Sequence, residues 1–506
     1  MTTASPGLRA LMVYALVLPL ALLLGYLLAT PTDLSTLGTV ALVFSIVSLP
    51  LILKWHFECM LLSWNMLAVV FFLPGAPELW LVTAFTSLAI ALGQRALSRD
   101  MSFIPVPSLT WPLVYILVVV LLTARLTGGM GLRALGSGTY GGRGYIWILG
   151  GVIGFWAMTA YRIPVARALL CTGLFLLGGA ASIITTIIAF GPSQFYNLAL
   201  VFPVSGAEFG KIANELGYTA GFSDPIERFS GLTFACNAMF CFLLARYGIR
   251  QMFSGTRLWR FALLVVLVLT GALGGFRSVF ILEALTFLLL FYFEGLFRSK
   301  YFGFFLGTLI LVGALLVPLA NKLPLSIQRA ISVLPLKLDP IARFEAESST
   351  QWRVEMWEML LPEVPRYLWL GKGLAVSGAD LELSADLAGR GQMSSQELAI
   401  TGGVYHNGPL TLLIPFGIWG ALGWIWLVVA SIRALYRNHR YGDESLRRIN
   451  AFLLAFFVAK VVMFFTLYGD FRSEFASFVG LVGFSVALNG GIRRKAESVR
   501  SAQEPV

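Results

Sequence analysis

The sequence predicts an all-α polytopic membrane protein with about 14 transmembrane helices and one large extracytoplasmic loop. Of its 506 residues, 58% are hydrophobic and only 12% are charged, whereas about 25% of the residues of a soluble domain are charged. Apolar runs of about 20 residues, the length that spans a bilayer as a helix, recur along the chain. These runs are continuously apolar, so they predict helices rather than the alternating strands of a barrel.

The predicted spans follow these apolar runs in chain order. The run at 58–73 is short, and the runs at 258–275 and 277–296 nearly touch. The first run, 8–29, is too long for the apolar core of a signal peptide and no cleavage signal follows it, so we expect a retained span. The full set is 8–29, 34–53, 58–73, 78–94, 109–126, 145–161, 166–190, 230–247, 258–275, 277–296, 301–320, 408–432, 449–468 and 472–490.

Basic residues in the short loops predict the orientation of these spans, because lysine and arginine concentrate on the cytoplasmic side. Placing the N-terminus inside puts nearly all basic loops inside, from Lys54 to the tail with Arg493 and Arg494. We therefore expect both termini to be cytoplasmic. The net charge of +11 is then explained by orientation, and we predict no nucleic-acid partner.

The spans divide the chain into four predicted regions. Residues 1–320 hold the first eleven spans, 321–407 form the large periplasmic loop, 408–490 hold three further spans, and 491–506 form a cytoplasmic tail. A loop as long as 321–407 is usually functional. Helical pieces are predicted within it around 326–334, 350–361 and 376–390.

His406 is the candidate catalytic residue. It lies in the segment Val404-Tyr405-His406-Asn407-Gly408, just before the span 408–432. Histidine is the side chain most readily used as a base near neutral pH. The alternative is an interfacial histidine that only packs or caps.

Three arginines on the predicted outward side are candidate binding residues: Arg228, Arg277 and Arg353. The positive-inside tendency argues against arginine there without a reason. A guanidinium matches a phosphate through two parallel hydrogen bonds, so these residues fit a phosphorylated lipid. The alternative is local pairing, of Arg228 with Glu227 and of Arg353 with Glu355.

Other charges lie within or between the predicted spans. Glu283 and Lys460 fall inside spans, where charges are costly; we expect them to pair with each other, while a transporter would use them for ion coupling. The turn 468–474 carries three charges, and we expect it to line a cavity on the outward side together with the outward arginines. The cysteines show no metal-ligand spacing, and neither a metal nor a cofactor is predicted.

The order of short motifs resembles the O-antigen ligase and O-antigen polymerase superfamily over about residues 225–430. The motifs are Arg228-Phe229-Ser230-Gly231 with Asn237, Arg277-Ser278, Arg353 with Trp357, Gly371-Lys372-Gly373, and His406-Asn407 followed by Gly417 and Gly420.

The resemblance implies a GT-C-like, metal-independent glycosyltransferase in the bacterial inner membrane. Its donor would be a polyprenyl-diphosphate-linked glycan, undecaprenyl diphosphate being the carrier, used at the outer face of the membrane. It implies that His406 is catalytic, and that Arg228, Arg277, Arg353 and Asn407 bind the diphosphate or the glycan. Besides the bilayer, a chain-length regulator and a flippase are the implied partners.

Some positions depart from the family pattern. Phe276 and Val279 flank Arg277-Ser278 where serine and glycine are common, and Pro409-Leu410 follows Gly408. A lipopolysaccharide ligase and a polymerase for O-antigen, capsule or exopolysaccharide both remain open. The rival functions are a flippase or transporter for lipid-linked sugars, against which the absence of an internal repeat argues, and a non-enzymatic scaffold.

Overall fold

The computed structural model describes residues 21, 25, 50, 53–97, 103–131, 137, 139–204, 206–215, 226–253, 257–390 and 392–495. The chain forms two compact units, Met1–Cys59 and Met60–Val506. Nearly all of the spans predicted at 8–29 and 34–53, and most of the predicted tail, lie outside the described residues. In the first unit, residues 53–59 are helical.

The span predicted at 58–73 is wrong, because residues 64–73 are not helical. Their polar groups are satisfied by distant partners instead of by a helical ladder. The N–H of Val69 donates to the carbonyl of Val201 at 2.8 Å, and Val69 also forms a bridge with Glu78. The side-chain amide of Asn65 donates to the carbonyl of Phe175 at 2.6 Å. An apolar run therefore lies in the protein here without crossing it as a helix.

From Leu79 onward, the N-terminal half of the second unit is helical where spans were predicted. The 3-10 segment at Gly178 packs closely against the segment that contains Leu62. A Cβ added to Gly178 would lie 1.9 Å from the carbonyl oxygen of Leu62. The elements are α3 (Leu79–Leu97), α4 (Pro107–Leu126), α5 (Gly142–Thr159), η2 (Val165–Arg167), α6 (Ala168–Leu177), η3 (Gly178–Ser182), α7 (Ile183–Phe190), η4 (Ser193–Leu200) and α8 (Gly206–Glu215).

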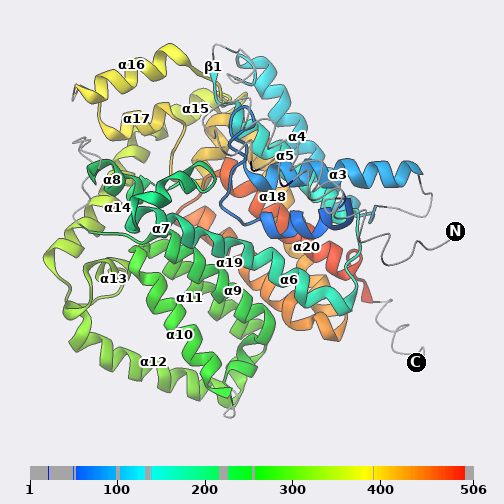
Figure 1. Cartoon of the computed structure of the whole chain (residues 1–506), viewed down its shortest axis with the longest axis vertical. Helices are drawn as coiled ribbons and strands as arrows, with labels where there is room; N and C mark the ends of the chain where they lie inside the picture. The colour runs from blue at the N-terminus through cyan, green and yellow to red at the C-terminus, as the bar shows by residue number, and fades with distance from the viewer. Residues whose placement is uncertain are drawn as a thin grey trace. The chain divides into compact units, whose positions relative to one another are not determined.

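Four helices form the part of the fold that carries the candidate site. They are α9 (Ser230–Met252), α11 (Arg277–Phe293), α18 (Gly408–Tyr441) and α19 (Arg447–Thr466). Helix α19 packs against the other three, as Figure 1 also shows. At 1.5 Å per residue α9 is about 35 Å long, enough to cross a hydrocarbon core of about 30 Å. We call the end with Arg228 the outer end and the opposite end the inner end.

Other helices surround this group. Helix α20 (Phe471–Asn489) packs along α5. No residue of α12 is buried, which fits a helix facing lipid. The remaining elements here are α10 (Trp259–Gly271), η6 (Ala272–Gly274), η7 (Leu296–Arg298), α12 (Lys300–Leu319), η8 (Ala320–Lys322) and η10 (Glu444–Leu446).

The described residues contain eight helical segments that are long and apolar enough to cross a membrane. The prediction of an all-α polytopic membrane protein is therefore confirmed. The run 258–275 is helical but short, at Trp259–Gly274. The count of about 14 spans and the GT-C-like arrangement stay predictions.

The predicted loop 321–407 is largely helical, and α14, α16 and α17 group together in Figure 1. Helix α14 begins at Pro340, well before the predicted piece at 350–361, because Asp339 caps it by accepting from the N–H of Ile341 at 2.8 Å. A two-residue antiparallel pair, β1 with β2, ties the loop to the glycine-rich segment 127–144. The elements are α13 (Leu325–Ala330), α14 (Pro340–Leu360), η9 (Leu361–Glu363), α15 (Val364–Tyr367), α16 (Gly378–Gly389), α17 (Ser395–Thr401), β1 (Thr139–Tyr140) and β2 (Val376–Ser377).

Candidate active site

The three predicted outward arginines, Arg228, Arg277 and Arg353, line one cavity of about 350 Å³ at the outer end. Arg228 precedes α9, Arg277 is the first residue of α11, and Arg353 extends from α14. Tyr468, in the turn after α19, lines the same cavity. The structure thus brings together residues that are far apart in the sequence.

Arg277 occupies a position that favours an anion. It begins α11, where backbone N–H groups lack helical partners and the helix dipole is positive. A cation placed there is unfavourable by itself, and a bound anion would relieve both charges. The turn before it contains Gly275 at φ +67°, and its carbonyl accepts a hydrogen bond from Arg329 at 2.8 Å.

Arg329 also lines the cavity, and the sequence interpretation did not single it out. It is buried, with 5% of its surface exposed, and it holds the turn that leads into Arg277. The available signal was an arginine in the predicted outward loop, the same signal that pointed to Arg353. Arg329 lies in a helix of only six residues, and no motif around it pointed to a functional role.

The alternative of local pairing, of Arg228 with Glu227 and of Arg353 with Glu355, differs from the contacts that the structure describes. Arg228 lies 3.8 Å from the carboxylate of Glu345 on α14. Glu227 instead pairs with Lys211 at 3.6 Å, while Glu355 accepts from two glutamine amides. Glu227 and Glu355 therefore both have partners other than Arg228 and Arg353.

Within the part of the chain that the structure describes, neither Arg277 nor Arg353 forms a salt bridge. The two guanidinium groups are close enough to repel each other. Burial lowers the pKa of Arg353, an effect that the nearby Tyr468 opposes. Two partly buried cations facing one cavity without a carboxylate make a site for an anion.

The backbone at His406 is held in an uncommon conformation. Its φ is +49°, a left-handed value that costs about 1–3 kcal/mol for a residue other than glycine. Two hydrogen bonds hold the turn: the Trp357 indole donates to the carbonyl of Tyr405 at 3.0 Å, and Arg472 donates to the carbonyl of Gly403 at 2.6 Å. The turn that carries the imidazole is therefore held by α14 through Trp357 and by the first turn of α20 through Arg472.

The His406 imidazole lies between two aromatic rings, Trp352 at 5.6 Å and Tyr468 at 5.5 Å between centroids. Its Nδ1 is buried and has no hydrogen-bond partner among the described residues. Burial lowers the pKa of His406, the cation of Arg353 lowers it further, and Asp470 opposes both. The imidazole is consequently neutral near pH 7 and able to accept a proton. His406 does not itself line the cavity but contacts Tyr468, which does.

Asn407 has a structural role. Its side-chain oxygen caps α18 by accepting from the N–H of Leu410 at 3.1 Å. The adjacent Gly408 is needed for close packing, since an added Cβ would lie 2.3 Å from the carbonyl oxygen of Phe464. The predicted contact of Asn407 with substrate stays a prediction.

The Gly371-Lys372-Gly373 motif attaches the loop to a break in α18. The N–H groups of Lys372 and Gly373 donate to the carbonyls of Ile414 and Pro415 at 2.7 and 2.9 Å. Gly371, at φ +81°, has no room for a Cβ beside Pro415. The motif therefore fixes the loop on the helix that His406 precedes.

The predicted pairing of Glu283 with Lys460 is wrong. Lys460 instead lies 3.5 Å from Glu474, in the turn and helix start that follow α19. Glu283 is buried in α11. Among the described residues no three of His, Cys, Asp and Glu gather closely enough to hold a metal ion.

Fold and site together define a polytopic α-helical membrane protein with an arginine-lined cavity beside a partly buried histidine. A model of the family described as O-antigen ligase matches residues 235–425, a range that contains Arg277, Arg353 and His406. The match confirms the resemblance to the O-antigen ligase and polymerase superfamily, whose enzymes transfer glycosyl groups from lipid-linked glycans in membranes. No curated protein matches the chain.

Proposed function

We propose that this protein is an inverting glycosyltransferase that polymerises or ligates polyprenyl-diphosphate-linked glycan repeat units at the periplasmic face of the inner membrane. The observation that carries the proposal is the cavity in which Arg277 and Arg353 face each other without a carboxylate, next to the neutral His406. A diphosphate supplies the charge that this cavity lacks, and an acceptor hydroxyl supplies the proton that His406 takes.

The reaction follows from these positions. The acceptor hydroxyl attacks the anomeric carbon of the donor sugar from the side opposite the leaving group, so the configuration inverts. The bond from that carbon to the diphosphate oxygen breaks, and its electron pair leaves with the polyprenyl diphosphate. Arg228 and Arg277 stabilise the developing negative charge, and Arg353 orients the donor. His406 accepts the proton of the hydroxyl.

The cations that this mechanism needs are guanidinium groups, so it proceeds without a metal. The loop 321–407 positions both glycans over the cavity, since α14 supplies both Arg353 and the tryptophan that holds the His406 turn. The lipid chain of the donor stays in the bilayer beside the four-helix group.

A transfer assay tests the proposal directly. The purified full chain is incubated in detergent with lipid-linked donor and an acceptor glycan, with and without EDTA, and products are separated by size. We expect products with EDTA present, and a rate about 10²–10⁴-fold lower in His406→Ala. A wild-type rate in that variant contradicts the base assignment. If the chain reconstituted in lipid vesicles moves the donor across the vesicle membrane but never consumes it, the protein is a transporter.

The phenotype of a deletion strain separates polymerase from ligase. Single repeat units left on the lipid A core indicate that a polymerase is missing. Polymer that accumulates on the polyprenyl carrier indicates that a ligase is missing.

A further inference from the structure

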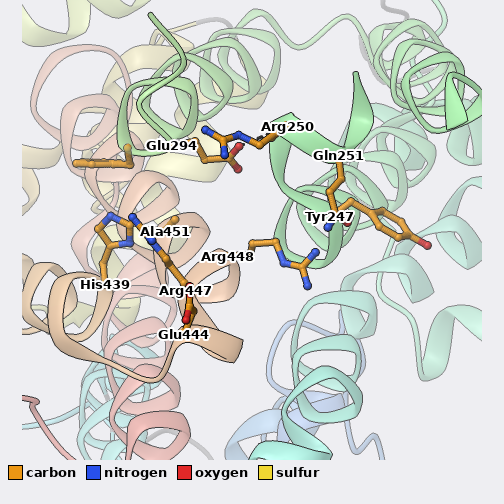
Figure 2. A pocket seen from close by; sticks show the side chains of 10 residues that line it. Tyr247, Arg250, Gln251, Glu294, His439, Glu444, Arg447, Arg448 and Ala451 are labelled. Carbon is orange, nitrogen blue, oxygen red and sulfur yellow. Dashed lines mark hydrogen bonds between the residues drawn. The ribbon is translucent and has the colours of Figure 1, made fainter. Parts of the chain in front are cut away.

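A second arginine-lined pocket, of about 270 Å³, lies at the inner end of the same four helices. Figure 2 shows Arg250 of α9 across the pocket from Arg447 and Arg448 at the start of α19. His439, near the end of α18, lies at the same pocket. The mechanism proposed above uses none of these residues.

The pocket lies a membrane thickness away from the candidate active site. Arg228 precedes α9 and Arg250 lies near its last residue, so the two sites are separated by nearly the whole helix, about 30 Å. Helix α19 likewise begins at Arg447 and ends beside the outer cavity. The two pockets therefore face opposite membrane–water interfaces.

The arginines of this pocket have no fixed anionic partner. Arg250, Arg447 and Arg448 are all exposed, and in the described ranges none of them forms a salt bridge. Arg447 and Arg448 also occupy the first turn of α19, which continues directly from η10, so the positive end of the helix dipole lies beside them and favours an anion.

Two carboxylates line the pocket as well, but one is engaged by the backbone. Both oxygens of Glu294 accept hydrogen bonds at 2.9 Å, from the N–H groups of Ile249 and Arg250. These bonds satisfy the two backbone N–H groups that follow the break in α9 at Gly248, whose φ is +62°. Glu294 attracts Arg250 and Arg448 without forming a salt bridge with either. With Glu444 the carboxylates number two against three guanidinium groups, so the pocket keeps a positive charge.

We propose that this inner pocket binds a phosphate group at the membrane surface opposite the candidate active site. Guanidinium groups bind phosphate oxygens in pairs, and basic pockets between transmembrane helices suit anionic head groups. The phosphate belongs either to an anionic phospholipid or to a soluble phosphate compound, since both present the same oxygens to Arg447 and Arg448. The side chains of Phe293 and Ala451 give the pocket an apolar wall beside the acyl region.

Binding to the purified full chain tests the proposal. Three probes are titrated in dodecyl maltoside and followed by native mass spectrometry: dioctanoyl phosphatidylglycerol, zwitterionic dioctanoyl phosphatidylcholine, and inorganic pyrophosphate. The variants are Arg447→Gln, Arg448→Gln and Arg448→Lys. The matched control is Arg437→Gln, which removes an exposed arginine of α18 that does not line the pocket.

We expect an anionic probe to bind, and each glutamine variant to weaken it about tenfold. Arg448→Lys should retain part of the affinity, and Arg437→Gln all of it. Binding of phosphatidylglycerol alone assigns a lipid, and binding of pyrophosphate assigns a soluble compound. Equal binding of phosphatidylcholine and phosphatidylglycerol overturns the proposal, as does an equal loss in Arg437→Gln or no anionic binding. The elution profile and Tm of each variant without ligand verify that it is folded.

Discussion

The outer and inner ends of the four-helix group both place a histidine near several arginines, yet they differ in burial. At the outer end Arg277 and Arg353 are partly buried under the loop 321–407, while at the inner end Arg250 and Arg448 are exposed. A charge pair at 4 Å is worth about 1 kcal/mol in water and about 4 kcal/mol near a partly screened protein surface. The arginines at both ends are the residue type that binds phosphate. Because the outer arginines are partly buried, we expect the outer end to stabilise charge more strongly than the inner end.

A second difference is backbone strain. His406 sits in a left-handed turn that two side chains hold in place, whereas His439 lies in a regular part of α18. Strain of this kind persists only where surrounding contacts enforce it. The outer end thus combines covered charge with an enforced histidine position, and the inner end has neither.

The largest effect we predict in this comparison is that of removing an outer arginine. Arg277→Ala should lower the rate of glycan transfer by about 10²–10³-fold, because it removes hydrogen-bond donors that stabilise the negative charge developing on the diphosphate. Arg277→Lys should recover only part of the lost rate, since an ammonium group does not reproduce the paired N–H donors of the guanidinium. The control is Arg437→Ala at the inner end, expected to keep the wild-type rate. Comparable losses in the two variants would remove the distinction between the ends.

Packing of the His406 turn against α19 is the next test. Gly408→Ala should destabilise the protein by about 1–3 kcal/mol, since the new Cβ meets the carbonyl of Phe464. The measurement is Tm in detergent. Gly313→Ala is the matched control, because nothing lies within 4 Å of its added Cβ, and it should be neutral or slightly stabilising. An unchanged Tm in Gly408→Ala would contradict the close packing.

The pH profile tests the coupling of Arg353 to His406. Transfer requires a neutral imidazole, so activity falls as pH drops through the pKa of His406, which burial and Arg353 hold below its usual value. Arg353→Gln removes that cation, so the pKa should rise and the acidic limb of kcat/KM should move to higher pH. Arg366→Gln, in the exposed pair with Glu363, should leave the limb in place. A limb that stays fixed in Arg353→Gln would mean that the base is another group.

The smallest effect should come from the partner of Arg228. The pair with Glu345 spans 3.8 Å and is partly exposed, and such pairs contribute about 0–1 kcal/mol. Glu345→Gln should therefore shift Tm little. A large loss of stability would show that Arg228 serves mainly to hold α14 in place.

The candidate site was predictable to an uneven degree. The sequence singled out three arginines because arginine is unexpected on the outward side, and it singled out His406 because a histidine lies just before a predicted span. The arginines are Arg228, Arg277 and Arg353. The salt-bridge partner of Arg228 was not predictable, since Glu345 lies on α14, far away along the chain. Lys460 pairs with Glu474 rather than Glu283, because side-chain direction on packed helices, invisible in the sequence, decides which charges meet.

Hydrophobicity and charge along the chain by themselves determined the membrane-spanning helical class and the candidate residues, because burial in lipid acts on each segment separately. The tertiary structure alone decided that residues 64–73 leave the helix, that Arg329 holds the turn at Gly275, and that Asn407 is a cap. It also decided that the same helices hold an arginine-lined pocket at each end. These features depend on contacts between distant segments, and the partners in such contacts are specified only when the helices pack.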